Sequence, residues 1–75
     1  MSKIPEYVLV LVSEYILARK YNVKQTMFFK NEVDLHIKKL NLNKKEVYFY
    51  FGDPDNPATK TETLNKIEEF RKNVM

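Results

Sequence analysis

The chain has 75 residues, of which 44% are hydrophobic and 31% charged, with a net charge of +3 and no cysteine. This length corresponds to one domain, residues 1–75, near the size at which a single core is only just sufficient, and the apolar fraction excludes a disordered chain. The absence of cysteine excludes a disulfide and a thiolate metal site. The small, aromatic-rich core also predicts that an apolar face is buried in a homodimer.

Positive charge is concentrated in the middle of the sequence. Residues 19–45 carry eight Lys or Arg against two acids, a net +6, whereas residues 1–18 carry one base against two acids and residues 46–75 four bases against six acids. Such an asymmetry predicts a polyanionic partner. The alternative is that the lysines only keep a small apolar domain in solution.

A membrane segment and a signal peptide are not expected. No stretch approaches the roughly 20 consecutive apolar residues of a transmembrane helix. The apolar run at 7–12 is interrupted by Ser13 and Glu14, and no small-residue cleavage site follows it. We therefore expect an intracellular, cytoplasmic protein without a membrane partner.

The first predicted helix spans residues 5–21. Pro5 suits the first helical position, where its missing N–H costs nothing. The run at 7–12 fits a buried strand as well as a helix, and length favours the helix. Two versions stay open: one uninterrupted helix that is apolar nearly all round, or a break at Ser13, which can cap a second helix. Both versions end at Tyr21 and Asn22, and asparagine tolerates the left-handed conformation of a helix end.

The second predicted helix spans residues 24–40. Its core stripe is formed by residues at positions i, i+4, i+8 and i+11, namely Phe29, Val33, Ile37 and Leu40. Phe28 and Leu35 are expected to widen this buried face. Lys38 and Lys39 close the last turn, where the helix dipole favours cations.

The segment 46–51, with the sequence EVYFYF, predicts a strand because it is aromatic and β-branched throughout. Gly52 and the proline-rich turn after it end the strand, and a last helix follows at about 60–74. Residues 58–63 fit either a second strand that makes a wing or the start of that helix, through a Thr59–Glu62 capping box. Without a second strand, 46–51 is expected to pair with a symmetry mate or with residues 7–12.

Residues 13–26, SEYILARKYNVKQT, resemble the local pattern of winged helix-turn-helix DNA-binding domains, with a capped helix, Leu-Ala, an apolar corner residue and a Thr that opens the next helix. The sequence departs from that pattern in carrying Asn22 where the family usually has glycine. The resemblance implies an α+β, winged-helix-like fold of three helices with a short strand or hairpin. It also implies a homodimeric transcriptional regulator that inserts residues 24–39 into the major groove of double-stranded DNA.

The resemblance assigns roles to polar residues of the basic segment. Gln25 and Asn31 are expected to contact adenine, and Lys30 guanine or phosphate. The rest mostly hold the phosphate backbone. The full set of candidate nucleic-acid contacts is Lys24, Gln25, Thr26, Lys30, Asn31, Lys38, Lys39, Lys44 and Lys45.

The second hypothesis is a protein–protein interaction module without a nucleic-acid role, typical of small accessory proteins of viruses and mobile elements. Its first helix and aromatic strand would bury a dimer or partner surface around Leu9 and Phe49. An aromatic strand could also stack unpaired RNA bases, although a core strand is the simpler interpretation.

Catalysis and metal binding are not expected. The chain lacks a cysteine nucleophile, a triad-like set and a glycine-rich phosphate loop, so we expect no enzyme, no cofactor and no small-molecule substrate. His36 is the only histidine, and with Glu32 and Asp34 it would make at most a poor metal site. Residues 53–56 lack the downstream glutamate of a calcium loop.

Overall fold

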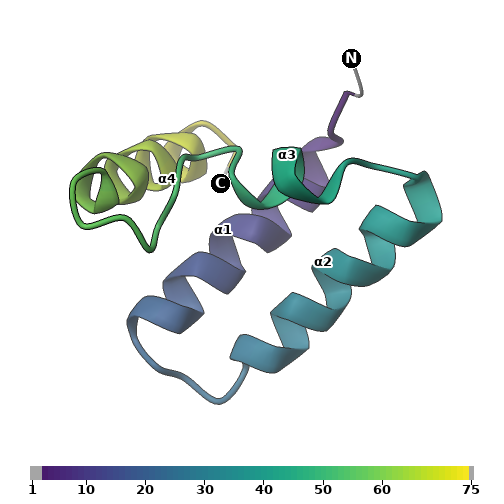
Figure 1. Ribbon diagram of the computed structural model, residues 1–75, viewed down its shortest axis with the longest axis horizontal. Helices are drawn as coiled ribbons and strands as arrows, with labels where there is room; N and C mark the ends of the chain where they lie inside the picture. Colours follow the sequence, from purple (N-terminus) through teal and green to yellow (C-terminus); the bar gives the residue numbers. More distant parts are fainter. Residues whose placement is uncertain (1–2, 75) are drawn as a thin grey trace.

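The computed structural model describes residues 3–74 and folds them into helices joined by turns (Figure 1). The helices follow one another as α1 (Glu6–Lys20), α2 (Thr26–Leu40), α3 (Lys44–Tyr48) and α4 (Lys60–Val74). Within these residues there is no β-strand and no sheet. The expected α+β class, winged-helix-like with a strand or hairpin, was therefore wrong, and the domain is all-α.

α1 runs through the molecule without a break, which decides between the two versions of the first helix. Ser13 does not cap a second helix, because its hydroxyl donates to the carbonyl of Val10 at 2.7 Å and the residue is fully buried. Pro5 lies one position before the helix, and its carbonyl accepts hydrogen bonds from two N–H groups of the first turn. The uninterrupted helix predicted at 5–21 is confirmed to within one residue at each end.

α1 and α2 form an antiparallel hairpin (Figure 1). Asn22 turns the chain with a φ of +52°, and its N–H and that of the next residue donate to carbonyls in the last turn of α1. This is the Schellman arrangement that ends many helices. Near the other end of the pair, the ring of Tyr7 packs edge-on against His36 of α2, with centroids 5.3 Å apart. The second predicted helix is confirmed, beginning at Thr26.

The predicted strand at 46–51 was wrong. Asn43 accepts a hydrogen bond from the N–H of Glu46 at 3.1 Å, which caps the short helix α3. Val47 and Phe51 are 0% and 3% exposed, whereas Phe49 between them is 49% exposed. A strand would place these three on one face, but one helical turn places only residues four apart together. The spacing of the apolar residues therefore outweighed their strand propensity.

The last helix begins at Lys60, so residues 58–63 are not a wing strand. The preceding residues form tight turns in which the Asp53 and Asn56 side chains accept backbone N–H hydrogen bonds. The Thr59 hydroxyl donates to the carbonyl of Asp53 at 3.2 Å, and the Thr59 carbonyl accepts the N–H of Thr63. The prediction of a helix start near Lys60 is confirmed.

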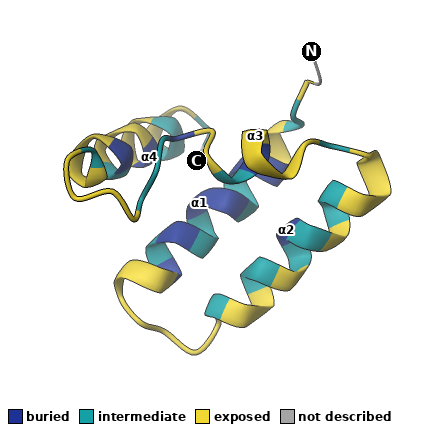
Figure 2. Ribbon diagram, in the orientation of Figure 1, coloured by how far each residue is buried: buried dark blue, intermediate teal, exposed yellow. Residues whose placement is uncertain are grey.

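The core is arranged around α1 (Figure 2). Val8 and Val12 of α1 have no exposed surface, and neither do Val33 of α2, Val47 of α3 and Ile67 of α4. Each of the other three helices thus contributes a fully buried residue to one cluster around α1. The predicted single domain contains this single core.

Candidate interaction surfaces

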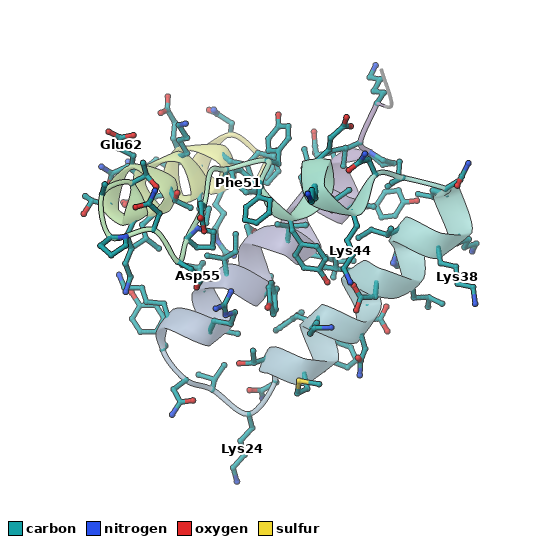
Figure 3. The ribbon with its side chains drawn as sticks, viewed as in Figure 1. Lys24, Lys38, Lys44, Phe51, Asp55 and Glu62 are labelled. Carbon is teal, nitrogen blue, oxygen red and sulfur yellow. The ribbon has the colours of Figure 1, made fainter. Side chains whose placement is uncertain are left out.

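The nine predicted DNA contacts are spread from the turn before α2, along α2, to the start of α3, and Figure 3 labels Lys24, Lys38 and Lys44 among them. Lys24 lies in the turn of the hairpin, whereas Lys38 lies in the last turn of α2. At about 1.5 Å of rise per residue, the two positions are roughly 20 Å apart along the helix. The structure therefore does not bring the predicted contacts together in one patch.

At the start of α2, one of the predicted contacts is already occupied. The Thr26 hydroxyl donates to the carbonyl of Val23 at 2.7 Å. Gln25 occupies the cap position, exposed and without a capping hydrogen bond from its side chain. Lys24 is exposed as well. This end of the helix offers one exposed lysine and one amide, too little for a base-reading surface.

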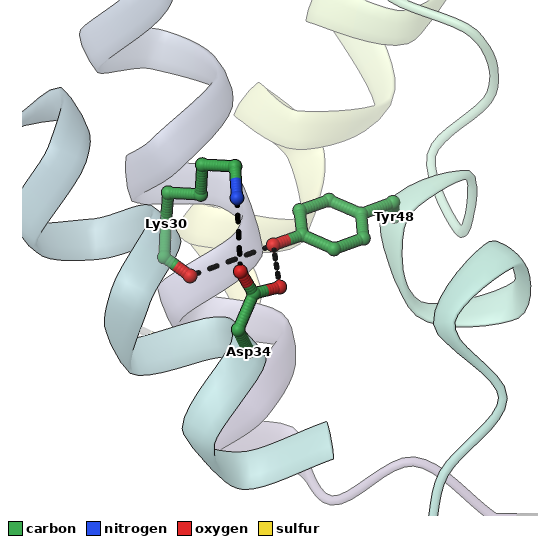
Figure 4. Close-up of polar contacts among 3 residues, drawn as sticks. All are labelled: Lys30, Asp34 and Tyr48. Carbon is green, nitrogen blue, oxygen red and sulfur yellow. Dashed lines mark hydrogen bonds and ion pairs between the residues drawn. The ribbon is translucent and has the colours of Figure 1, made fainter. Parts of the chain in front are cut away.

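Lys30 is held in a polar cluster that joins α2 to α3 (Figure 4). Its Nζ lies 2.9 Å from Oδ2 of Asp34, one helical turn later. The hydroxyl of Tyr48 donates to Oδ1 of Asp34 at 2.5 Å and approaches the carbonyl of Lys30 at 3.5 Å. The charge of Lys30 is therefore balanced within the fold, and its predicted role at guanine or phosphate has no support in this geometry.

The electrostatics of the cluster follow from these contacts. Partial burial raises the pKa of the Tyr48 hydroxyl, and the neighbouring Asp34 carboxylate raises it further. Burial also acts to raise the pKa of Asp34, but hydrogen bonds from Tyr48 and Lys30 outweigh it and lower the pKa. The hydrogen bond to Asp34 raises the pKa of Lys30. All three groups are thus fixed in the protonation states that they have near neutral pH.

Four other lysines gather where α2 ends and α3 begins. We call this surface the basic corner; it consists of Lys38, Lys39, Lys44 and Lys45, all exposed. Between the two pairs the chain turns at Asn41, whose φ is +55°, and three residues connect the helices. None of the three ion pairs found in residues 3–74 includes a lysine of this corner. The charge of Lys44 helps to lower the pKa of the Asp34 carboxyl, and the other three lysines present their charge to solvent.

The helix dipole bears differently on the lysines of the basic corner. Lys38 and Lys39 lie in the last turn of α2, where the dipole favours cations. Lys45 lies in the last turn of the five-residue helix α3, and only Lys44 stands at the first position of that helix. Lys44 has a local contact, because its Nζ lies 5.9 Å from the centre of the Tyr48 ring.

The outer face of α2 carries large apolar side chains that the fold does not cover. Met27, Phe28 and Leu35 are 60%, 59% and 56% exposed. Phe28 and Leu35 lie two turns apart on the same face, opposite the buried Val33. We call Met27, Phe28, Asn31 and Leu35 the outer stripe of α2. The prediction that Phe28 and Leu35 widen the buried face was wrong; both were misassigned because α1 covers only one side of the helix.

The two residues predicted to form a dimer or partner surface, Leu9 and Phe49, differ in exposure. Leu9 is 6% exposed and packs within the core, so a partner cannot reach it. Phe49 is 49% exposed, beside Tyr50 at 54%. The aromatic segment therefore leaves two rings at the surface, although not as a strand.

Two ion pairs elsewhere use charges that the sequence left unassigned. Arg19 donates to Asp55 at 2.6 Å, and Arg71 pairs with Glu14. The first balances one charge of the basic segment with an acid from outside it. The second fixes α4 on α1.

His36 is held within the α1–α2 hairpin. Its Nδ1 lies 2.8 Å from the carbonyl of Glu32, and its ring contacts Tyr7. Among residues 3–74, no three His, Asp or Glu side chains are placed to share a metal ion. The Asp53 carboxylate accepts a backbone hydrogen bond in its turn.

Comparison with known proteins returned no match: no family model, no curated protein and no solved structure matches the chain. The resemblance of residues 13–26 to winged helix-turn-helix proteins therefore stays a prediction. No helix in the described part of the chain has both the length and the apolar character needed to span a bilayer.

Proposed function

We propose that this protein binds the phosphate backbone of duplex DNA through the basic corner. The observation that carries the proposal is the gathering of four exposed lysines, without ion pairs within residues 3–74, from two helix ends. Lysine contacts phosphate oxygens as a point-charge donor, and contacts to phosphate carry no sequence information directly.

Sequence reading through α2 is not part of the proposal. Lys30 is bound to Asp34, the Thr26 hydroxyl is bound to its own backbone, and the outer face of α2 is apolar at its centre. Binding should therefore depend on charge and salt but little on base sequence. Duplexes of different sequence are expected to bind with similar affinity.

The expected salt dependence follows from the number of lysines. Four neutralised phosphates give a slope of log K against log salt of about −3.6, at roughly 0.9 per phosphate. Affinity should then fall roughly 150-fold between about 50 mM and 200 mM salt. Fluorescence anisotropy with random-sequence duplex DNA and protein in the low micromolar range measures both quantities.

A matched pair of variants tests the location. Changing Lys39, Lys44 and Lys45 to Gln should weaken binding and lower the magnitude of the slope by about 2.7, roughly 0.9 for each lysine that no longer neutralises a phosphate. The control changes Lys60, Lys66 and Lys72 of α4 to Gln, which removes the same charge from exposed positions. The control should keep most of the affinity and the slope. Equal reductions in the two variants would show that only net charge matters, and absence of binding at low salt would refute the proposal.

A second candidate function, binding of a protein partner, is favoured by a separate observation. The outer stripe of α2 exposes three large apolar side chains at helical spacing. Apolar surface gathered in this way marks contact sites on small proteins.

A further inference from the structure

We infer that the DNA bound by the basic corner has unpaired bases beside it, and that Phe49 and Tyr50 stack on those bases. The two rings follow Lys45, the last lysine of the corner, by four and five residues. They are 49% and 54% exposed. The inference rests on the proposed function, because it adds a base-binding surface to the lysines that contact phosphate.

The turn that continues α3 places Phe49 beside Lys45. The N–H of Phe49 donates to the carbonyl of Lys45 at 2.9 Å, so the two residues are one helical turn apart. Residues four apart lie on one face of a helix, and the fully buried Val47 points to the core from the opposite face. A nucleotide whose phosphate binds Lys45 therefore has the Phe49 ring within reach of its base.

Tyr50 forms one wall of a groove of about 500 Å³ between α3 and the segment before α1. Ile4 gives this groove an apolar surface, and Lys3 and Glu46 contribute one charge of each sign. Because these charges balance, the groove suits a flat, neutral group such as a nucleobase better than a phosphate. Its volume lies within the range of roughly 300–1,000 Å³ that is usual for pockets binding small molecules.

The ring of Tyr50 is exposed, yet it is held in place by the core. It packs at 82° against the ring of Phe51, with centroids 5.0 Å apart, and Phe51 packs against Phe70 of α4 at 5.3 Å. Phe51 is 3% exposed, so this row of rings connects a surface ring to the core. A ring that is fixed before binding loses little conformational freedom when a base stacks on it, which favours binding.

The lysines beside the two rings favour a nucleic acid over a protein as their partner. Surfaces that bind single strands combine aromatic side chains, on which bases stack, with cationic side chains that contact the backbone. The basic corner supplies four exposed lysines, and none of them belongs to a salt bridge within residues 3–74. Lysines for the phosphates and rings for the bases thus occur next to each other.

A comparison of single-stranded with duplex DNA separates stacking from charge. A duplex has the higher charge density, with a salt slope of about 0.9 per phosphate against about 0.7 for a single strand, so charge alone favours the duplex. We expect oligothymidylate of about 16 nucleotides to bind about tenfold more tightly than a duplex of the same length at equal salt, measured by fluorescence anisotropy. An abasic strand of that length keeps the phosphates and should lose the advantage.

Variants of the two rings identify the surface. Phe49→Leu and Tyr50→Leu should each weaken single-strand binding by about fivefold or more and leave duplex binding unchanged, because leucine is apolar but cannot stack. Tyr50→Phe keeps the ring and should bind as the wild type does. The matched control is Phe28→Leu, which changes an exposed ring on the outer stripe of α2 and should alter neither affinity. Circular dichroism confirms that each variant is folded.

The outcomes distinguish this inference from the proposed function. Absence of binding to both forms of DNA at low salt would refute the two together. Duplex binding that depends on Lys39, Lys44 and Lys45, without tighter binding of the single strand, would keep the proposed function and overturn the inference. Single-strand binding that is insensitive to both leucine variants, or equally strong for the abasic strand, would also overturn it and would leave the two rings to a protein partner.

Discussion

α1 and α2 are both 15 residues long and lie side by side, yet they are buried to very different extents. α1 has buried residues along its length, from Val8 to Ala18, whereas α2 buries only Val33. The apolar composition of α1 is therefore explained by the fold alone. The composition of α2 is not, because four of its large apolar side chains, Met27, Phe28, Leu35 and Leu40, are exposed.

This difference separates residues that stabilise the core from exposed residues that are accessible to a partner. A helix apolar on all sides belongs in a core, and α1 has α2, α3 and α4 around it. α2 has an uncovered apolar stripe that leads to the lysines of the basic corner. Function is therefore to be sought on the second helix and its end, and the following experiments test that division.

The largest expected difference is in the free energy of unfolding, between a side-chain truncation in α1 and one in α2. Ile16→Ala in α1, where the side chain is 3% exposed, should lower the free energy of unfolding by about 3 kcal/mol. Leu35→Ala in α2, where the side chain is 56% exposed, should change it by at most about 0.5 kcal/mol. Urea denaturation at low micromolar concentration measures both free energies of unfolding. Equal reductions would show that the Leu35 side chain is covered in solution.

A second difference concerns how α2 is attached to the rest of the fold. Tyr48→Phe removes the hydrogen bond to the Asp34 carboxylate, and we expect the free energy of unfolding to fall by about 1.5 kcal/mol at neutral pH. In an Asp34→Asn background the same change should cost less, because the acceptor is no longer charged. An equal cost in both backgrounds would mean that Tyr48 acts by packing alone.

The Asp34–Tyr48 hydrogen bond predicts that the effect of Tyr48→Phe on stability depends on pH. The effect of Ile16→Ala in α1 should not. The pKa of Asp34 is lowered by folding, so its contribution is present above the unfolded value, about 3.9, and is lost as the pH falls through the folded value. The stability gap between wild type and Tyr48→Phe should therefore close in acid. The pKa of Tyr48 is raised, so wild type should also lose stability above about pH 10, where the unfolded phenol ionises. Ile16→Ala should show neither effect relative to wild type in urea titrations at each pH.

The smallest effects are expected at the helix ends, where α1 and α2 are alike. Asn22 and Asn41 both have left-handed backbones, with φ of +52° and +55°. Alanine at either position should cost about 1 kcal/mol, whereas glycine should cost nothing or stabilise slightly. Thermal denaturation of the four variants measures this. Unequal costs at the two ends would show that one turn is held by its surroundings and not by the residue.

The sequence predicted those elements whose apolar residues recur at one period over many residues. The helices at 5–21, 24–40 and 60–74 were predictable because Phe29, Val33 and Ile37, and likewise Leu64 and Ile67, repeat as helix faces do. The segment 46–51 was not, because strand propensity and helical spacing disagree over six residues. In the structure, the burial of Val47 and Phe51, four residues apart, and the capping hydrogen bond of Asn43 resolve that conflict.

The candidate surfaces were predictable in part. The four lysines of the basic corner were visible as a run of charge, and the spacing of Lys30 and Asp34 shows that the two can pair. The involvement of Tyr48 was not visible, because it comes from a separate helix. The exposure of Phe28 and Leu35 was hidden for a related reason. A helical pattern shows which residues share a face of the helix. Which face is covered depends on how the other helices pack against it.

The central position of α1 also has a consequence for the nascent chain during synthesis. α1 leaves the ribosome before α4, yet Ile67 and the ion pair of Arg71 with Glu14 complete its cover, the latter across 57 residues of sequence. The α1–α2 hairpin can form early, but it leaves one side of the most apolar helix open to water. Until α4 has been synthesised, the nascent chain exposes that side to chaperones and to other chains.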